Sequence, residues 1–440
     1  MDRIEEIGLT AIPGMMLEEI FRDLPKSAPQ LHTLCIDSSI FTQIPNSGPT
    51  FSIHEDLFCD TEQLRRVGLI RCGIGWDSKL LTGLTSLGLE DSLNADTTIV
   101  QVLDALKRMP ALTDLYLKDS IPNNSEGLST YPVVDLPCLR ALNISSDVGP
   151  LTDLLHHITF PQNTILNLVC KETQSTQINF SKFLSVLATR FLSSMEFRSL
   201  SLRASDDNQT HGLEFFLWTN PTIQDCFPSH LFCQFQLHLV LAWPFQQPHN
   251  HEKALTWAFD AMGFTFLTQV QMSTLNIISS RTLVMTFGRL PLLEQVCVQS
   301  YTPYPFFEAL VYKRSTAEKS IAAYRTVAFP KLRYIHLEGV SFYSRSLTTI
   351  SVDRLLSYLM ERCERNADVQ MLRLDGCYYI SSYGVERLKE IVVDVVWDGV
   401  EQEALQETLQ EFFEGPEEDE DYESDGDPFL DFGYDPNVWY

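Results

Sequence analysis

Residues 96–117 read DTTIVQVLDALKRMPALTDLYL, and this stretch predicts a helix followed directly by a strand. Apolar residues recur at helical spacing over its first half, and either Asp96 or Thr97 can cap the helix at its start. Pro110 stops that helix. The closing L-x-x-L-x-L pattern alternates as a strand does, with leucines on one side and the intervening residues on the other.

The same L-x-x-L-x-L pattern, with other apolar residues allowed, recurs along most of the chain. Clear copies occupy 31–36, 64–69, 84–89, 112–117, 139–144, 197–202, 267–272, 293–298, 332–337 and 369–374, and weaker copies end at 168 and 241. Several copies are preceded by proline two residues before the first leucine. Five of the gaps between copies fall in the range of about 20–29 residues that is typical of leucine-rich repeats, and the others require insertions.

A unit of one strand and one helix cannot bury its apolar face alone, so such units stack. We therefore predict an α/β fold, an irregular leucine-rich-repeat solenoid in which a curved parallel sheet is lined by outer helices. The alternative is an ordinary globular α/β fold whose strands happen to contain the L-x-L pattern.

The copy at 369–388, VQMLRLDGCYYISSYGVERL, is the sharpest. It resembles the cysteine-containing leucine-rich repeat, whose pattern is L-x-x-L-x-L-x-x-C-x-x-I-T-D-x-G-L. The matching residues are Leu372, Leu374, Cys377, Ile380, Gly384, Val385 and Leu388, whereas Ser381 and Ser382 replace the usual Thr-Asp pair. We expect Cys377 just after a strand with its thiol buried in the turn, in a structural role.

That repeat is common in F-box proteins, and the whole chain resembles the fungal F-box-like group with irregular leucine-rich repeats and an acidic end. The resemblance implies a substrate receptor of an SCF-type ubiquitin ligase, with a Skp-type adaptor and a cullin ligase as partners. Residues 12–24 are similar to the opening of an F-box, but its second and third helices are missing, because a strand pattern already begins at Leu31. We therefore interpret residues 1–30 as an N-terminal helical cap.

The charge is concentrated at one end of the chain. The 440 residues include 58 acidic and 32 basic ones, which gives a formal net charge of −26, and residues 401–440 hold 15 acidic residues and no Lys or Arg. The remaining 400 residues therefore carry −26 + 15 = −11. A chain this acidic is a poor match for nucleic acid phosphates or an anionic membrane. We expect protein partners, no nucleic acid and no membrane.

The predicted solenoid spans 31–397. Asp398 and Glu401 form a pair similar to a capping box, so 398–414 is predicted as a C-terminal capping helix that starts at Gly399 and buries apolar residues on the last repeat. Residues 415–440 are predicted to be an acidic disordered tail, because a block of like charges repels itself. A partner with a basic patch is the expected ligand of this tail.

The cysteines favour a reducing compartment. None of the ten forms a C-x-x-C pair, and most lie in or beside apolar runs. The chain also shows no secretory signal and no apolar stretch of the ~18 residues that a membrane-spanning helix needs. We expect a cytoplasmic or nuclear monomer.

The sequence lacks two common motifs of enzyme active sites. It contains neither a G-x-x-x-x-G-K-S/T phosphate loop nor a G-x-S-x-G nucleophile elbow. The His249-Asn250-His251-Glu252 stretch is interpreted as a polar loop rather than a metal site. We expect no enzyme activity and no catalytic, cofactor-binding or metal-binding residues.

The residues between the leucines should face the concave side of the sheet, where mixed charge with Tyr and Arg is typical of a protein-binding surface. The candidate partner-binding residues are Arg66, Tyr116, Lys118, Tyr334, His336, Glu338, Arg373 and Asp375. We predict a non-enzymatic scaffold for protein–protein interaction. Two alternatives remain open, an enzyme on a non-repeat α/β fold and a degenerate repeat protein that retains no partner.

Overall fold

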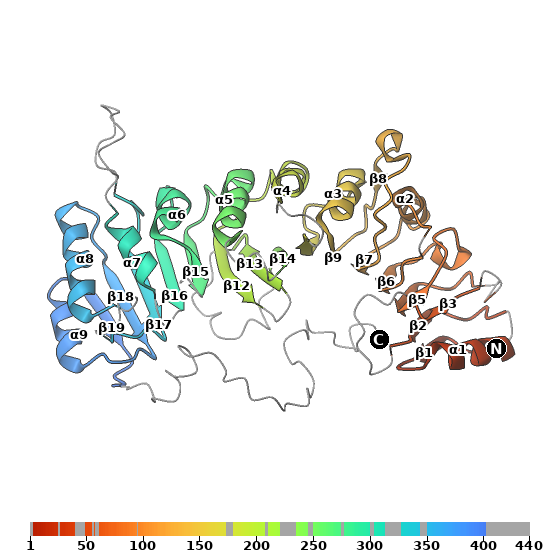
Figure 1. Ribbon diagram of the computed structural model, residues 1–440, viewed down its shortest axis with the longest axis horizontal. Helices are drawn as coiled ribbons and strands as arrows, with labels where there is room; N and C mark the ends of the chain where they lie inside the picture. The colour runs from red at the N-terminus through yellow and green to blue at the C-terminus, as the bar shows by residue number, and fades with distance from the viewer. Residues whose placement is uncertain are drawn as a thin grey trace.

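The computed structural model of the chain describes residues 3–24, 27–39, 49–54, 57, 61–94, 96–172, 179–206, 210–220, 235–244, 250–273, 277–299, 303–312, 327–343 and 350–401. Within these residues the chain is a mixed α/β protein built on one large, mostly parallel sheet. Figure 1 shows the strands following one another in an arc, with helices along its outer side. No helix within the described part is both long and apolar enough to span a membrane.

The large sheet has 15 strands in the described part of the chain, in the order β1-β2-β4-β6-β7-β9-β11-β14-β13-β12-β15-β16-β17-β18-β19. The strands are β1 (Glu6–Leu9), β2 (Thr33–Asp37), β4 (Arg66–Ile70), β6 (Ser86–Glu90), β7 (Asp114–Lys118), β9 (Ala141–Asp147), β11 (Ile165–Lys171), β12 (Ser199–Asp206), β13 (Thr210–Trp218), β14 (Leu237–Pro244), β15 (Gln269–Ser273), β16 (Gln295–Gln299), β17 (Tyr334–Glu338), β18 (Met371–Asp375) and β19 (Asp394–Trp397). Two short pairs lie apart from it, β3 (Phe51–Ser52) with β5 (Cys72–Gly73), and β8 (Val134–Asp135) with β10 (Ile158–Thr159).

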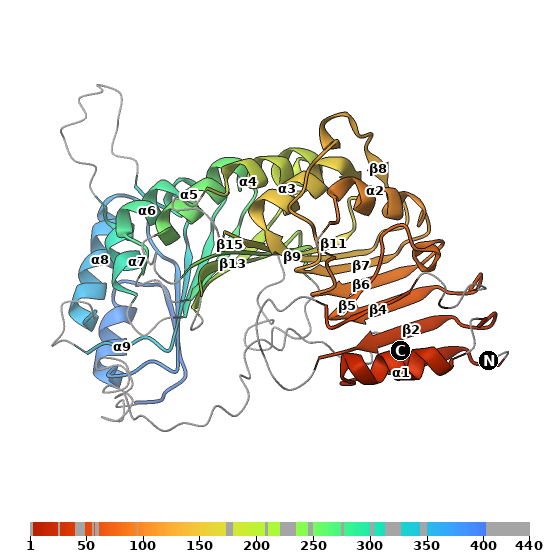
Figure 2. The ribbon, with the colours of Figure 1, turned by 45° about the vertical axis from the view of Figure 1, so that its right-hand side comes forward.

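The helices cover the outer side of this sheet. They are α1 (Gly14–Asp23), α2 (Ile99–Lys107), α3 (Val148–His157), α4 (Ser181–Leu187), α5 (His251–Met262), α6 (Ser280–Met285), α7 (Tyr304–Leu310), α8 (Val352–Glu364) and α9 (Ser382–Lys389). Consecutive helices from α2 to α5 pack against one another, as do those from α6 to α9. Figure 2 shows the middle of this row from the side. The core lies between the helices and the sheet, and the leucines of the repeated pattern point into it.

Each copy of the pattern places a strand of the large sheet, as the spacing predicts. Its apolar residues stand opposite those of the neighbouring strands, so that Leu87 pairs with Val67 on one side and with Leu115 on the other. All three side chains are fully buried. A one-residue shift in pairing would move the leucines to the other face of the sheet, so their burial specifies the register.

A left-handed residue recurs directly after a strand at both ends of the arc. The φ angles are +54° at Arg71, +47° at Asp91, +48° at Asp119, +66° at Gly339 and +56° at Gly376. The backbone N–H of each of the first four donates to a carbonyl at or near the end of the next strand in the sheet, at 2.8–3.0 Å. This turn extends the hydrogen bonding between neighbouring strands one residue beyond each strand. The leucine spacing does not predict this recurring turn.

The expectation of a wholly parallel sheet is wrong at the centre of the arc. β13 pairs antiparallel with both β12 and β14, whereas every other neighbouring pair in the described sheet is parallel. β13 carries no L-x-x-L-x-L pattern, but Leu213, Phe215 and Leu217 alternate along it and are buried. It therefore fills the space between two repeat strands with the same buried face.

The α2 helix begins one residue later than predicted. Thr98, rather than Asp96 or Thr97, is its N-cap, and the Thr98 side chain accepts from the Gln101 N–H at 3.3 Å. The Gln101 side chain in turn accepts from the Thr98 N–H at 2.9 Å. Only Thr98 has a Gln or Glu three residues on, so the reciprocal capping box selects it.

The N-terminal segment contains more than the helical cap expected for residues 1–30. The helix α1 lies there and buries Leu17 and Phe21, but β1 precedes it and pairs in parallel with β2. The segment thus has the strand-then-helix order of the units that follow. It adds an edge strand that the sequence pattern did not indicate.

The helix predicted for 398–414 does not begin at Gly399. Residues 398–401 are not helical, and Gly399 has a φ of +78°. Asp398 accepts instead from the Gly376 N–H at 2.6 Å and from the Val400 N–H at 3.0 Å, while Glu401 accepts from the Ser382 N–H at 2.7 Å. Asp398 therefore bonds to the turn after β18, and Glu401 bonds to the start of α9. The rest of that helix and the tail at 415–440 lie outside the described residues.

The interpretation of 249–252 as a polar loop is wrong for its described part. His251 is the buried first residue of α5, and its ring packs edge-on against Trp243 with centroids 4.8 Å apart. Glu252 accepts from the Ser279 N–H at the start of α6 at 2.6 Å. Both residues join neighbouring units, and position 249 lies outside the described residues.

Cys377 lies where the sequence places it. Its side chain is 1% exposed in the turn after β18, and its Sγ lies 3.5 Å from the Leu337 carbonyl and 3.6 Å from the Asp375 carbonyl. Burial raises the pKa of this thiol to about 12. The thiol is therefore protonated at neutral pH and acts as a buried hydrogen-bond donor.

Candidate functional site

The candidate site is the inner face of the sheet, which is the face opposite the helices. All eight residues predicted to bind a partner lie on it, at positions that alternate with buried leucines, and each is partly or fully exposed. Two regions of this face have a defined architecture, one near each end of the arc. They are called here the N-terminal hollow and the C-terminal cluster.

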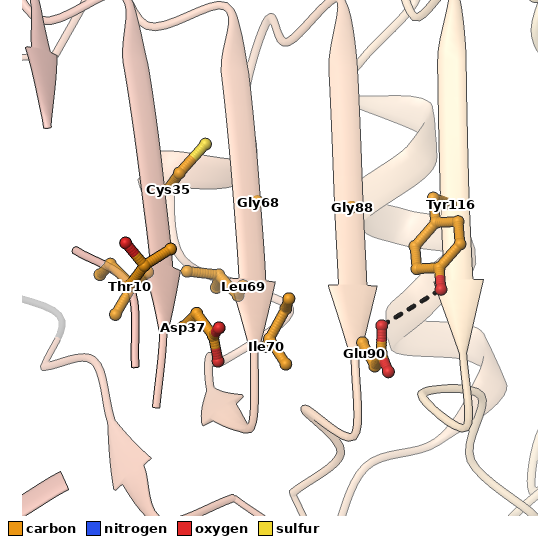
Figure 3. Close-up of a pocket in the computed structure, with 10 residues that line it drawn as sticks. Thr10, Cys35, Asp37, Gly68, Leu69, Ile70, Gly88, Glu90 and Tyr116 are labelled. Carbon is orange, nitrogen blue, oxygen red and sulfur yellow. Dashed lines mark hydrogen bonds between the residues drawn. The ribbon is translucent and has the colours of Figure 1, made fainter. Parts of the chain in front are cut away.

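The N-terminal hollow lies over β2, β4, β6 and β7 (Figure 3). Gly68 and Gly88 form its floor, because these two residues stand in register between Cys35 and Tyr116 and have no side chains. Around this row the hollow is lined by Thr10, Ile36, Asp37, Leu69, Ile70 and Glu90. Two adjacent glycines on one face of a sheet let another chain approach the backbone closely.

Charged groups stand at one side of this hollow. Glu90 accepts from the Tyr116 hydroxyl at 3.1 Å and from the Lys118 ammonium at 2.8 Å, so two of the predicted residues share one carboxylate. Beyond them, Lys171 bonds to Asp119 at 2.9 Å. Burial raises the pKa of Asp91, and the neighbouring carboxylates of Asp119 and Glu90 raise it further. The cations of Lys118 and Arg71 oppose this increase. The carboxylates at this edge are those of Asp37, Glu90, Asp91 and Asp119, and they outnumber the cations of Arg71, Lys118 and Lys171 by one.

The C-terminal cluster spans β16, β17 and β18 and consists of Cys297, Gln299, His336, Glu338, Arg373 and Asp375. These residues lie together because of the strand register. Cys297, His336 and Arg373 are paired across the three strands, and so are Gln299, Glu338 and Asp375 two residues further along. Asp375 accepts from His336 Nε2 at 2.8 Å and from Arg373 Nε at 2.6 Å. On the other side, Cys297 Sγ lies 3.4 Å from His336 Nδ1.

Glu338 completes this cluster. Gln299 donates to its carboxylate at 2.5 Å. One ligand atom from each of Cys297, His336 and Glu338 lies within 4.8 Å of the other two. In the described part of the chain this is the group of side chains that could hold a metal ion.

The cluster does not have the properties of an activated nucleophile. A Cys-His-Asp series works in catalysis when the thiol pKa is depressed. Burial raises the pKa of Cys297 well above its ordinary value, and the carboxylates of Glu338 and Asp375 raise it further, against the opposing charge of Arg373. In the ion-free cluster the thiol is therefore protonated at neutral pH, unlike the thiolate of an activated cysteine nucleophile.

The two remaining predicted residues belong to neither of these groups. Arg66 stands at the other end of β4, in register with Thr33 and Ser86. Tyr334 lies beside the C-terminal cluster, in register with Gln295 and Met371, and burial raises its pKa. The inner face thus brings together two groups of predicted residues rather than one.

The candidate set omitted Glu90, Gly68 and Gly88, which make the hollow. Their signal was present, since Gly68 and Gly88 lie between apolar residues of their copies and Glu90 directly follows the copy at 84–89, and such positions face inward. The Cys297–Glu338 approach was missed because the two residues are 41 positions apart in the numbering, and only alignment of the copies at 293–298 and 332–337 brings them near one another. No protein-family model matches this chain, and no curated protein matches it either.

Proposed function

We propose that this chain is a leucine-rich-repeat solenoid that works as a non-enzymatic scaffold and binds a protein partner on its inner face. The observation that carries the proposal is the coincidence of sequence and structural repeats. Apolar ladders and outer helices recur together along the arc, and the left-handed residue after the strand recurs at both of its ends. Stacked units of this kind build an extended concave surface, which repeat proteins use for binding.

The N-terminal hollow supports a partner that presents a basic side chain. Its floor is backbone, and Tyr116 and Cys35 stand on either side of it. The excess of carboxylates beside it would be offset by a Lys or Arg of the partner. Aromatic and arginine residues such as Tyr116 and Arg373 commonly dominate binding energy at protein interfaces.

The experiment compares the protein with a variant whose hollow is filled. Gly68→Tyr suits this purpose, because Gly68 has no left-handed backbone and an added Cβ would meet Cys35 Sγ at 3.4 Å, an ordinary contact. The matched control is Met360→Gln on α8, which changes an exposed residue of the outer side. The wild-type and variant chains are used as affinity baits, and the retained proteins are quantified by mass spectrometry.

The proposal predicts a partner that the wild-type and Met360→Gln chains retain equally. Gly68→Tyr should weaken its binding at least tenfold, which corresponds to about 1.4 kcal/mol. Equal recovery by all three baits would refute a role of the hollow. No retained protein on any bait would refute the scaffold.

A role as a substrate receptor of a ubiquitin ligase would require adaptor binding, and α1 is the candidate surface for it. Met15 and Met16 of this helix are 80% and 54% exposed, although Leu17 beside them is buried. Adjacent exposed methionines offer an adaptable apolar surface of the kind that a Skp-type adaptor could cover. The test is a pull-down of a Skp-type adaptor by the wild-type chain and by Met15→Lys/Met16→Lys. If the wild type recovers no adaptor, the receptor version is wrong and the scaffold remains.

A further inference from the structure

Three metal-ligating side chains of the C-terminal cluster converge on one point of the inner face. Cys297 on β16 stands directly opposite His336 on β17, and Glu338 follows His336 by two residues and so shares its face. One ligand atom of each lies within 4.8 Å of the others. All three come from adjacent strands of a continuous sheet, which positions ligands more rigidly than loops do.

The distance between Cys297 and His336 agrees with the geometry of a zinc ion. A thiolate sulfur about 2.3 Å and an imidazole nitrogen about 2.1 Å from a tetrahedral zinc ion are about 3.6 Å apart. The observed Cys297 Sγ to His336 Nδ1 distance is 3.4 Å. Thiolate, imidazole and carboxylate together are a donor set that favours zinc over magnesium or calcium.

The surrounding side chains hold these ligands in orientation. Asp375 accepts from His336 Nε2 at 2.8 Å, which directs the lone pair of Nδ1 toward Cys297. A carboxylate on the second nitrogen of a ligating histidine is the usual support of such a ligand. Glu338 is held in the same way, because Gln299 donates to it at 2.5 Å.

We infer that Cys297, His336 and Glu338 form a zinc site, and that Asp375 and Gln299 position its ligands. Three protein ligands leave the fourth position of a tetrahedral ion open. That position faces the inner surface, since His336 is 13% exposed and Asp375 beside it 27%. Water or a side chain of a bound protein completes the coordination. The inference is independent of the proposed scaffold function, because it concerns the binding of the ion alone.

The ion-free alternative is a simple hydrogen-bond series in which the Cys297 thiol donates to His336 Nδ1. Both arrangements give a similar sulfur-to-nitrogen distance, so a measurement must separate them. The full-length chain is stripped with a chelator and titrated with Zn²⁺, which is counted by elemental analysis after gel filtration. A parallel titration with Co²⁺ reports sulfur ligation through its thiolate-to-cobalt charge-transfer absorption in the near ultraviolet.

The wild-type chain should bind one Zn²⁺ and show the charge-transfer band with Co²⁺. Cys297→Ser should lose the band, and Asp375→Asn should bind Zn²⁺ about 10–100-fold more weakly, as expected for loss of a supporting carboxylate. Glu338→Gln, which preserves size, should weaken binding at least tenfold. Cys35→Ser is the matched control, because Cys35 lies on the same face of β2 and should leave the band unchanged.

Circular dichroism shows whether each variant is folded before it is titrated. If Cys297→Ser does not fold, the loss of Zn²⁺ affinity in Glu338→Gln still tests the site. Absence of a charge-transfer band in the wild type would overturn the inference, because the acidic residues of the chain bind Co²⁺ through oxygen alone and give no such band. Equal bands in Cys297→Ser and Cys35→Ser would overturn it as well.

Discussion

Arg362 offers a quantitative test of how neighbouring units hold one another. This residue near the end of α8 is fully buried. Its guanidinium donates to the carbonyls of Leu310 at 3.3 Å, Ala328 at 2.9 Å, Phe329 at 3.0 Å and Ala367 at 3.0 Å. One side chain thus joins α8 to the end of α7 and to the segment that leads into β17.

The variant Arg362→Met keeps the volume and removes the donors. Replacing a buried ion pair by apolar residues is often harmless, but the partners here are backbone carbonyls, which cannot be replaced. The Phe329 carbonyl also accepts from the Leu332 N–H, so, among the described residues, three of the four carbonyls are left without a donor. At roughly 1–3 kcal/mol for each unsatisfied buried group, the loss is about 6 kcal/mol.

Part of that loss is offset. Burial lowers the pKa of Arg362 to about 10, so the folded state disfavours the charged guanidinium by about 3 kcal/mol, and the variant no longer carries this penalty. The net destabilisation expected is therefore about 3 kcal/mol. Because proteins open locally in cooperative segments, the destabilisation should appear first in the segments that Arg362 joins.

Hydrogen exchange measured by mass spectrometry is the assay. Amides of α8 and β17 should exchange about 100-fold faster in Arg362→Met, since 1.4 kcal/mol corresponds to a factor of ten, while those of α2 stay unchanged. The control is Arg365→Met at the C-cap of the same helix, which removes a partly exposed ion pair with Glu361 and should change exchange by less than fivefold. Equal exchange in the two variants would refute the reasoning.

Three further predictions follow from local features. Alkylation at pH 8, mapped by mass spectrometry, should modify exposed Cys138 before Cys377, because a thiol with a pKa of about 12 is only about 10⁻⁴ thiolate at that pH; faster reaction of Cys377 would contradict its burial. Gly376→Ala should lower the free energy of unfolding by about 1 kcal/mol through its positive φ, whereas Gly149→Ala, at a position with open space and no positive φ, should not. Thr98→Ala should destabilise α2 by about 1 kcal/mol in chemical denaturation, and an unchanged midpoint would argue against the capping box.

Leucine spacing predicted the strands because burial alone sets their register. Leu87, Leu115 and Leu142 form one ladder across β6, β7 and β9, and each occupies the same place in its copy of the pattern. The inward direction of the residues between them follows from alternation, which is why Tyr116 and Lys118 were found on the inner face. Both predictions depend on neighbouring residues only.

Features that depend on distant residues could not be predicted. β13 has no leucine spacing, and the pattern does not indicate its antiparallel place between β12 and β14. Cys297 and His336 occupy the same place in consecutive copies of the pattern, so their pairing follows from strand register, but the spacing does not indicate that their side chains approach to 3.4 Å. The expectation of no metal-binding residue considered ligands close together in the sequence and did not compare residues across copies.

The most direct test of the central claim is site-specific photo-crosslinking of the partner. A photoreactive phenylalanine analogue is placed either at Tyr116 on the inner face or at Met360 on the outer helix α8, and the covalent products formed in cells are identified. An inner-face scaffold predicts a partner adduct from position 116 and none from position 360. An adduct from position 360 alone would contradict the account.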